Sequence, residues 1–255
     1  MRQDAIADMV RARGRVTVDG LASHFGVTPQ TIRKDLNDLA VRRRIVRVHG
    51  GAIRPSGTEN LEYDNRRQIA ADEKAAIGAK VAAIIPDDAS LFINIGTTTE
   101  AVSEALLGHR SLMVITNNLN VANRMRIYPQ IEVVISAGSV RGSDGGVVGE
   151  AAVDFIRQFK VDFAVISASA IDPDGALLDF DFREVKVARA IIENARHVIL
   201  AADSTKFARR APVRIGHLAQ MDTFVTDECS ASLQKVCEEH DVRLIQSGPF
   251  GKSST

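Results

Sequence analysis

The chain has 255 residues, of which 45% are hydrophobic and 25% charged, a composition typical of folded globular proteins and unlike that of disordered ones. No apolar run approaches the roughly 18 residues needed to cross a bilayer, and the first residues lack the apolar core of a signal peptide, so we expect a cytoplasmic protein. Cys229 and Cys237 lack histidine pairs at ligand spacing, so neither a disulfide framework nor a metal site is predicted.

The net charge of zero hides an uneven distribution along the chain. Residues 1–54 contain eleven lysines and arginines and five acidic residues, a net charge of +6, so the remainder carries −6. A small basic module joined to a larger acidic one predicts a polyanionic partner for the first part only.

Three helices are predicted in the basic module. Apolar residues recur at helical spacing over Arg2–Arg13, and Asp19 can cap a second helix that ends at Phe25. Gly26 supplies the turn before a third helix over residues 28–39. This spacing is typical of helix-turn-helix proteins, which place the second helix of the pair in the major groove of DNA.

The third helix has two faces of different chemistry. Ile32, Leu36 and Leu39 recur at the spacing of a buried face, whereas the other face carries donors and cations of the kind that reach bases and phosphates. An ordinary solvated face would have the same pattern if this helix stood alone. We predict DNA contacts from Thr28, Gln30, Thr31, Arg33 and Lys34.

Cations and aliphatic residues alternate over residues 42–52, a pattern that predicts a two-stranded wing with a glycine turn. Arginines in such a hairpin can lie along the phosphate backbone, although a basic hairpin that never meets DNA has the same pattern. Three consecutive arginines after a helix of this type favour DNA contact. The wing residues predicted to bind DNA are Arg42, Arg43, Arg44, Arg47 and His49.

The remaining chain predicts a second domain of α/β class. A polar segment without sustained periodicity, residues 55–72, is the predicted linker, with a short helix around residues 60–68, and Asp72 can cap a helix that continues to Ile85. Aliphatic strands then alternate with amphipathic helices, which predicts a mostly parallel sheet covered on both faces, with ligand loops at the carboxyl ends of its strands. The predicted domains are therefore a winged helix-turn-helix over 1–54, the linker, a sensor domain over 73–247 and a tail over 248–255.

The predicted strands of this sheet are residues 90–95, 112–116, 131–136, 162–167, 197–201, 223–226 and 242–245, and the helices between them are residues 98–107, 119–125, 151–159, 182–195 and 230–239.

The loops that follow these strands have the features of a sugar-phosphate pocket. After the first strand, a glycine, a helix start and three threonines offer close approach, free amides and hydroxyls, although a plain βα turn has the same pattern. Amide side chains in the companion loops suit sugar hydroxyls, and Arg141 and Lys206 suit a phosphate. The predicted effector-binding residues are Gly96, Thr97, Thr98, Thr99, Asn117, Asn118, Gly138, Arg141, Gly145, Gly146, Asp181, Glu184 and Lys206.

A family likeness is carried by seven motifs, T-P-Q-T-I-R-K-D-L, V-H-G-G-A, F-I-N-I-G-T-T-T, T-N-N-L-N-V-A-N, D-G-G-V-V-G-E-A, L-L-D-F-D-F-R-E-V and A-A-D-S-T-K-F. In this order they resemble the DeoR family of bacterial transcriptional repressors. The resemblance implies a winged helix-turn-helix joined to a sensor domain similar to ribose-5-phosphate isomerase-type folds. It also implies double-stranded operator DNA as a partner, a phosphorylated sugar or polyol as inducer, and a homodimer or homotetramer. The fourth, fifth and sixth motifs are most similar to the branch that responds to glycerol 3-phosphate.

One residue departs from the family pattern, and two other functions are conceivable. Asn94 stands where the family commonly has Asp, which would alter effector affinity if that carboxylate contacts the ligand. One alternative is a sugar-phosphate isomerase carrying a DNA-binding module, whose catalytic base would be Asp144, Asp179, Asp181 or Glu184. Carboxylates near a helix start are more often caps or hydroxyl ligands, which argues against the enzyme. The other alternative is a nucleotide-binding module, which the missing phosphate-loop lysine pattern disfavours. We therefore expect a repressor without catalytic residues, cofactor or metal.

Overall fold

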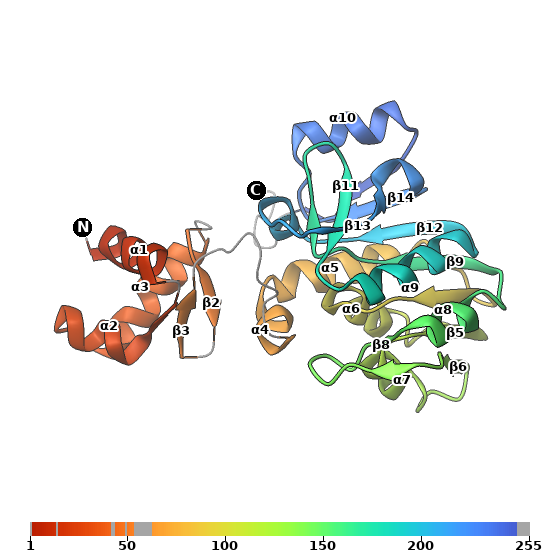
Figure 1. The fold of residues 1–255 in the computed structure, drawn as a ribbon, viewed down its shortest axis with the longest axis horizontal. Coiled ribbons are helices and arrows are strands. Elements are labelled where there is room, and N and C mark those ends of the chain that lie inside the picture. Colours follow the sequence, from red (N-terminus) through yellow and green to blue (C-terminus); the bar gives the residue numbers. More distant parts are fainter. Residues whose placement is uncertain (1, 14, 42–43, 49, 54–62, 249–255) are drawn as a thin grey trace. The chain divides into compact units, whose positions relative to one another are not determined.

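The computed structural model describes residues 2–13, 15–41, 44–48, 50–53 and 63–248, which fall into two compact units, Met1–Ile69 and Ala70–Thr255 (Figure 1). The boundary between the units falls within the segment expected to be a linker. Arg42, Arg43 and His49, all predicted to bind DNA, lie outside the described residues.

The first unit is a small helical domain with a three-stranded sheet. Its core is a cluster of buried aliphatic residues from the three N-terminal helices and the small sheet, which confirms the predicted buried face of Ile32, Leu36 and Leu39. The two predicted wing strands are present, and a third strand pairs with them in the order β1-β3-β2. The elements are α1 (Arg2–Arg13), β1 (Arg15–Thr17), α2 (Val18–Phe25), α3 (Pro29–Val41), β2 (Val46–Val48), β3 (Gly51–Ile53) and α4 (Tyr63–Gln68).

Caps determine where the helices of this unit begin and end. The N-cap of α2 is Thr17, whose side chain accepts a hydrogen bond from the Gly20 amide at 3.1 Å, so the predicted cap at Asp19 is wrong. Gly26 ends α2 in the left-handed conformation, with φ 62°, as predicted. The Thr28 hydroxyl accepts a hydrogen bond from the Thr31 amide at 3.2 Å, which confirms Thr28 at the start of α3.

The wing depends on a pair of glycines. Gly50 lies in the turn between β2 and β3 with φ 73°, a conformation that side chains rarely adopt. A Cβ atom on Gly51 would lie only 2.0 Å from the Val16 carbonyl oxygen, so the pairing of β1 with β3 requires glycine there. The V-H-G-G-A motif therefore has a structural reason besides any DNA contact.

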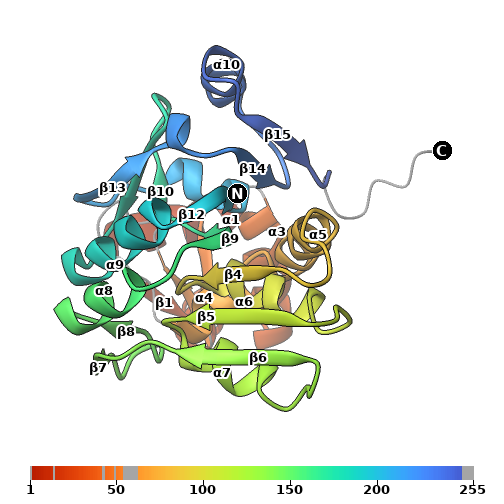
Figure 2. The same cartoon turned by 90° about the vertical axis from the view of Figure 1, so that its right-hand side faces the viewer.

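The second unit is built on a seven-stranded parallel sheet with the order β15-β14-β12-β9-β4-β5-β6 (Figure 2). All predicted strands of this sheet are confirmed, and their bounds differ from the prediction by two residues at most. The strands are β4 (Ser90–Ile93), β5 (Leu112–Thr116), β6 (Ile131–Ile135), β9 (Val161–Ile166), β12 (Ala195–Ala201), β14 (Thr223–Thr226) and β15 (Arg243–Gln246).

Alternation along the strands builds two cores, one on each face of this sheet. Leu91 and Ile93 of β4 belong to the cluster under α5, α6 and α7, whereas Phe92 belongs to the cluster under α8, α9 and α10. Both faces are therefore apolar, as a parallel sheet covered by helices requires. These helices are α5 (Ala71–Ala82), α6 (Thr97–Ala105), α7 (Leu119–Met125), α8 (Glu150–Ile156), α9 (Phe182–Glu193) and α10 (Ala231–Glu239).

Two parts of this unit were not predicted. One is the hairpin β7 (Ser139–Val140) and β8 (Val147–Val148), and the other is an antiparallel sheet with the order β10-β11-β13. That sheet comprises β10 (Ala170–Ile171), β11 (Ala176–Asp179) and β13 (Val213–His217), and the 3-10 helices η1 (Ser204–Ala208) and η2 (Leu218–Gln220) flank β13. The prediction that Asp72 caps α5 is wrong, because its N-cap is Ala70, which offers no side-chain hydrogen bond.

Candidate functional site

The outward face of α3 carries the polar residues predicted to contact DNA. Gln30, Arg33 and Lys34 are exposed, and Thr31 is half-buried. Asp35, on the opposite side of the helix, is buried and accepts hydrogen bonds from Arg2 and Gln3 of α1. Asp35 is thus neutralised inside the unit, while the cations Arg33 and Lys34 of α3 face outward.

The two described wing arginines have different surroundings. A guanidinium nitrogen of Arg47 donates to the backbone carbonyl of Arg33 at 3.2 Å, which fixes β2 beside α3. Burial and the neighbouring Arg33 cation lower the pKa of Arg47. Arg44 instead pairs with Asp4 of α1 at 2.5 Å. Arg33 and Arg47 therefore form one cationic surface, whereas Arg44 already has a partner within the protein.

In the second unit, the predicted effector residues follow the strands β4, β5, β6, β11 and β12. Because β12, β9, β4, β5 and β6 are consecutive parallel neighbours, their carboxyl ends and the loops after them lie at one edge of the sheet. Gly96 has φ 154°, and a Cβ atom there would lie 3.3 Å from the side chain of Ser167 after β9, so the loops approach one another closely.

Thr98 and Thr99 lie side by side in the first turn of α6 but differ in their contacts. The Thr99 hydroxyl donates within its own loop, with the carbonyl oxygens of Asn94 and Gly96 at 2.7 and 2.8 Å. The Thr98 hydroxyl is buried and has no hydrogen-bond partner among the described residues. Asn94, the residue that departs from the family pattern, accepts a hydrogen bond from the Ile95 amide at 2.7 Å. Thr99 and Asn94 therefore shape the loop, and Thr98 is available to a ligand.

Asn117 and Asn118 after β5 differ in the same way. Asn118 caps α7, and its amide nitrogen donates to the Glu100 carboxylate at 3.1 Å. The Asn117 amide nitrogen donates to the Val147 carbonyl at 3.2 Å, but its side-chain oxygen has no partner within the described chain. Asn117 is therefore the residue of this pair that retains a free acceptor.

Unpartnered buried polar atoms gather at this edge of the sheet. Most buried polar atoms in native proteins have a hydrogen-bond partner, so each exception needs an explanation. Counting only described residues, four of the atoms without one follow β4, β5, β6 and β12, and they are Thr98 Oγ1, Asn117 Oδ1, Ser136 Oγ and Asp203 Oδ2. Ser136 and Asp203 were not among the predicted effector-binding residues.

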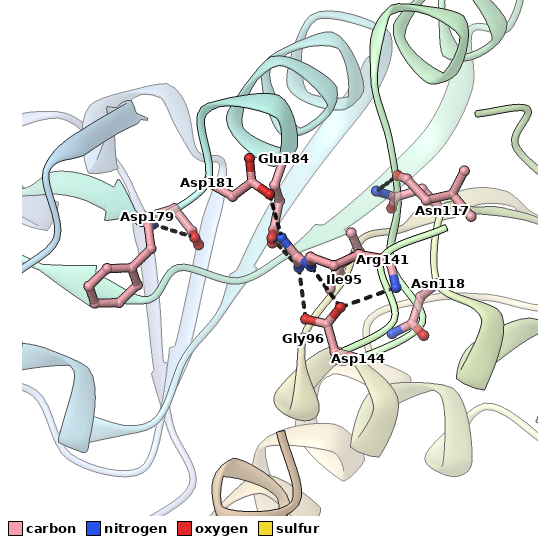
Figure 3. A network of polar contacts seen from close by, with 12 residues as sticks. Ile95, Gly96, Asn117, Asn118, Arg141, Asp144, Asp179, Asp181 and Glu184 are labelled. Carbon is pink, nitrogen blue, oxygen red and sulfur yellow. Dashed lines mark hydrogen bonds and ion pairs between the residues drawn. The ribbon is translucent and has the colours of Figure 1, made fainter. Parts of the chain in front are cut away.

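Arg141 lies at the centre of a cluster of carboxylates (Figure 3). Its guanidinium group binds Asp144 through two nitrogens at 2.8 and 2.7 Å, Asp181 at 3.0 Å and Glu184 at 2.6 Å. A phosphate would have to compete with three carboxylates for this cation. The prediction that Arg141 holds a phosphate stays untested, and these contacts favour a role in holding Asp181 and Glu184 beside the β7–β8 hairpin.

The pKa values of two carboxyl groups at the start of α9 are shifted in opposite directions, that of Glu184 in the helix upward and that of Asp181 at its N-cap downward. Burial, together with the neighbouring Asp179 carboxylate, raises the pKa of Glu184 to about 8 despite its contact with Arg141. Burial opposes ionisation of Asp181 as well, but hydrogen bonds from Arg183 and Arg141 outweigh it and lower the pKa of Asp181 to about 2. Glu184 therefore keeps its proton to a higher pH than an ordinary glutamate does, whereas Asp181 loses its proton at a lower pH than an ordinary aspartate.

The three predicted glycines of the hairpin have structural reasons of their own. A Cβ atom on Gly138 would lie 2.8 Å from the Val148 carbonyl oxygen, and one on Gly146 would lie 2.5 Å from the side chain of Ile95. Gly145 has φ 72°. These glycines allow the hairpin to pack against the loop after β4, and their predicted contact with an effector stays a prediction.

Lys206 is buried in η1 beside a second lysine that was not predicted. Burial alone would raise the pKa of Asp203, but the ammonium groups of Lys206 and Lys74 hold it below its ordinary value. Lys74 lies in the first turn of α5 and is only 3% exposed. A signal for it exists in the sequence, because Lys74 precedes Ile77, Gly78 and Val81 at the i, i+3, i+4, i+7 spacing of a buried stripe.

Both units match known protein families. Residues 2–58 match the DeoR-like helix-turn-helix domain, and residues 69–228 match the DeoR C terminal sensor domain. The chain belongs to the DeoR family. It is a DNA-binding transcriptional repressor of the DeoR type, and the isomerase alternative is set aside because the relatives of this DeoR-family protein are transcriptional regulators.

Among its curated relatives are glycerol-3-phosphate regulon repressors. That of Escherichia coli (strain K12) is 45% identical, over 95% of this chain and 97% of its own. That of Haemophilus influenzae is also 45% identical, over 96% of each chain. The repressor CsqR of Escherichia coli is 38% identical, over 96% of this chain and 94% of its own.

Solved structures similar to this DeoR-family protein include ribose 5-phosphate isomerase A from Neisseria gonorrhoeae. The two chains share a TM-score of 0.40 and 12% identity, over 55% of this chain and 54% of that one. Among the described residues, no helix combines the length and the apolar character needed to cross a membrane.

Proposed function

We propose that this DeoR-family repressor senses glycerol 3-phosphate at the carboxyl edge of its parallel sheet and that effector binding lowers its affinity for operator DNA. In this proposal α3 and the wing bind DNA, with Gln30, Thr31 and Arg33 facing bases and Lys34 and Arg47 holding phosphates. A dimer is the smallest assembly we expect, because helix-turn-helix proteins read paired half-sites.

The proposed location of the effector site is supported by the buried oxygen atoms without hydrogen-bond partners in the described chain that follow β4, β5, β6 and β12. The hydroxyls of Thr98 and Ser136 can donate to a phosphate, while the oxygens of Asn117 and Asp203 can only accept. A phosphorylated polyol matches both kinds of atom, because its phosphate accepts hydrogen bonds and its hydroxyls donate them. Two features supply positive potential for the phosphate. One is the pair of buried lysines beside Asp203, and the other is the N-terminus of α6.

Glycerol 3-phosphate is the favoured effector on two grounds. Two relatives that are 45% identical over nearly the whole chain are named as repressors of the glycerol-3-phosphate regulon. In addition, the carboxyl oxygens of Asp181 and Glu184, which Arg141 holds at one side of the site, can accept hydrogen bonds from the hydroxyl groups of a polyol.

The test is fluorescence anisotropy of labelled promoter DNA with the full-length protein and a panel of phosphorylated sugars and polyols. Glycerol 3-phosphate is expected to release the DNA at concentrations at which hexose phosphates do not. The effector must bind the two states unequally, and a 100-fold ratio corresponds to ~2.7 kcal/mol per site. Release by a hexose phosphate alone would overturn the choice of effector, and the absence of any response would overturn phosphate sensing.

A further inference from the structure

Strand β6 forms one edge of the seven-stranded sheet, and among the described strands it pairs only with β5 (Figure 2). Thr116 of β5 is aligned with Ile135 of β6, and the Ser136 amide donates to the Thr116 carbonyl oxygen at 2.9 Å. Because the backbone groups of successive residues in a strand point to opposite sides, those of Val133 and Ile135 point away from β5. No hydrogen bond from either outward N–H group is found within the described chain. The outer side of β6 is therefore an open row of donors and acceptors.

The chain around this edge is apolar and almost free of charge. Residues 127–140 contain one charged residue, Glu132, although 25% of the whole chain is charged. The described part of the second unit has four exposed large hydrophobic residues, and three of them, Ile127, Ile135 and Val140, lie in this segment. Exposed apolar groups that gather in one place mark interaction surfaces.

Strand β6 also lacks the features that keep edge strands from pairing. Natural edge strands carry proline, lysine or a bulge, because an unprotected edge accepts a strand from another chain. The sequence I-E-V-V-I contains neither proline nor lysine, and its pairing with β5 runs without a register shift. The opposite edge strand, β15, differs in that its two exposed residues are Arg243 and Gln246. Of the two edges of this sheet, β6 is the one suited to pairing.

A second copy of this chain fits the edge of β6 on grounds of symmetry and charge. Antiparallel pairing about a two-fold axis brings the same strand to both sides, so β6 is its own complementary partner. Glu132 lies near the start of β6, and pairing centred on Val133 or Val134 places it opposite Val134 or Ser136 of the second copy. Like charges therefore do not meet, and the uncharged remainder of the segment offers nothing to attract a strongly acidic or basic peptide.

We propose that β6 pairs antiparallel with β6 of a second copy and joins the two seven-stranded sheets into one continuous sheet. The pairing satisfies the outward backbone groups of Val133 and Ile135 and covers the exposed side chain of Ile135. This inference goes beyond the proposed function, because it assigns the surface that joins two sensor units and does not depend on which effector is bound.

The test uses full-length Ile135→Lys, with Phe182→Lys as the matched control. Both variants replace an exposed apolar side chain of the second unit by lysine, but Phe182 lies on α9 and not on the edge strand. Light scattering after size-exclusion chromatography over a range of protein concentrations gives the dissociation constant of the dimer. Ile135→Lys should raise it at least about tenfold, because two-fold symmetry changes two cross-strand pairs at once. Phe182→Lys should match the wild type, and a wild-type tetramer should fall to dimers with Ile135→Lys.

Ile135→Pro provides a second variant that acts on the backbone alone. Proline removes the outward N–H group of residue 135 and no hydrogen bond to β5, so it should weaken the dimer as Ile135→Lys does. Circular dichroism shows whether the two variants fold. If neither folds, amide hydrogen exchange of the wild type decides: a peptide over residues 131–136 should exchange more slowly above the dissociation constant than below it.

Three results would overturn this assignment. They are a wild type that is monomeric at every concentration, folded Ile135 variants that keep the wild-type mass, and exchange over residues 131–136 that does not depend on concentration. A wild type that pairs through β6 but does not respond to glycerol 3-phosphate would instead overturn the proposed effector and leave this interface in place.

Discussion

Two adjacent threonines in the first turn of α6 have the same chemistry but different contacts. The Thr99 hydroxyl has carbonyl oxygens of its own loop within hydrogen-bond distance, whereas the Thr98 hydroxyl has no partner in the described structure. Because a group that is buried without a partner costs stability, we propose that a ligand completes the hydrogen bonding of the Thr98 hydroxyl. The G-T-T-T motif therefore contains one residue that holds the loop and one that we assign to the effector.

Thr98→Val and Thr99→Val should consequently affect different properties, the first the effector affinity and the second the stability of the fold. The first replaces an unpartnered hydroxyl, so the free energy of unfolding should change by less than about 0.5 kcal/mol, while affinity for glycerol 3-phosphate falls roughly tenfold. The second removes the hydroxyl that donates to the buried Asn94 carbonyl oxygen, while the Gly96 carbonyl oxygen keeps the Glu100 amide as a donor, and it should lower the free energy of unfolding by about 1–3 kcal/mol. Urea unfolding and calorimetry on the two variants measure these changes. A Thr98→Val protein with unchanged effector affinity would remove Thr98 from the site.

At the scale of elements, we propose that α3 and the wing bind DNA, and the structure shows that their arginines are not equivalent. Arg33 is exposed beside Arg47, while Arg44 is paired with Asp4. Arg33→Ala should cost ~1–3 kcal/mol of operator affinity and relax sequence preference, because a base contact is lost. Arg44→Ala removes a cation that already has a partner and should weaken binding less. Anisotropy with operator and unrelated DNA checks both, and an equal loss on the two DNAs for Arg33→Ala would reassign Arg33 to a phosphate contact.

The carboxylate cluster joins α9 to the β7–β8 hairpin and makes stability depend on pH. Glu184 binds its proton more tightly in the folded protein, where its pKa is about 8, than in the unfolded chain, where the ordinary value is 4.5. The stabilisation from this proton is complete below the ordinary pKa and is lost as pH rises through about 8.

The free energy of unfolding of the wild type should therefore decline relative to Glu184→Gln between about pH 4.5 and pH 8. Urea unfolding across this range measures the difference. Glu193→Gln, which alters an exposed carboxylate on the same helix, serves as the control and should follow the wild type. Parallel pH profiles for wild type and Glu184→Gln would show that Glu184 is ionised throughout.

Elements with strong periodicity were predictable from the sequence, and contacts between distant loops were not. The parallel strands are runs of aliphatic residues bounded by turns, so their positions followed from pattern alone. Strands β7, β8 and β10 have two residues each and no period to detect. Arg141 meets Asp181 and Glu184 across 40 and 43 residues of sequence, so its ion pairs could not be inferred from spacing. Lys74 was not predicted because, in the sequence, a lysine next to a buried stripe has the same pattern as a surface lysine at the edge of a helix.

At the scale of the whole molecule, a DNA-binding unit and a sensor unit must be coupled for the effector to act. Coupling between two sites is reciprocal: if glycerol 3-phosphate lowers operator affinity by some factor, operator DNA lowers glycerol 3-phosphate affinity by the same factor. Competition for one shared surface would differ, because bound DNA would then exclude the effector altogether. The proposed site on the parallel sheet and the surface of α3 lie in different units of the chain, which favours coupling.

Calorimetric titration of glycerol 3-phosphate into protein saturated with operator DNA is therefore expected to give a finite affinity, weakened by the factor that anisotropy gives for DNA. If glycerol 3-phosphate lowers the operator affinity 100-fold, the operator must lower the glycerol 3-phosphate affinity 100-fold, a coupling free energy of ~2.7 kcal/mol. An unrelated DNA at the same concentration is the control. It should lower the affinity for glycerol 3-phosphate only by the factor by which glycerol 3-phosphate lowers the affinity for that DNA. Thr98→Val should bind the effector more weakly with and without operator while leaving the ratio unchanged, because it alters affinity and not coupling. Unequal factors in the two directions would show that effector and DNA act on different oligomeric forms rather than on one linked equilibrium.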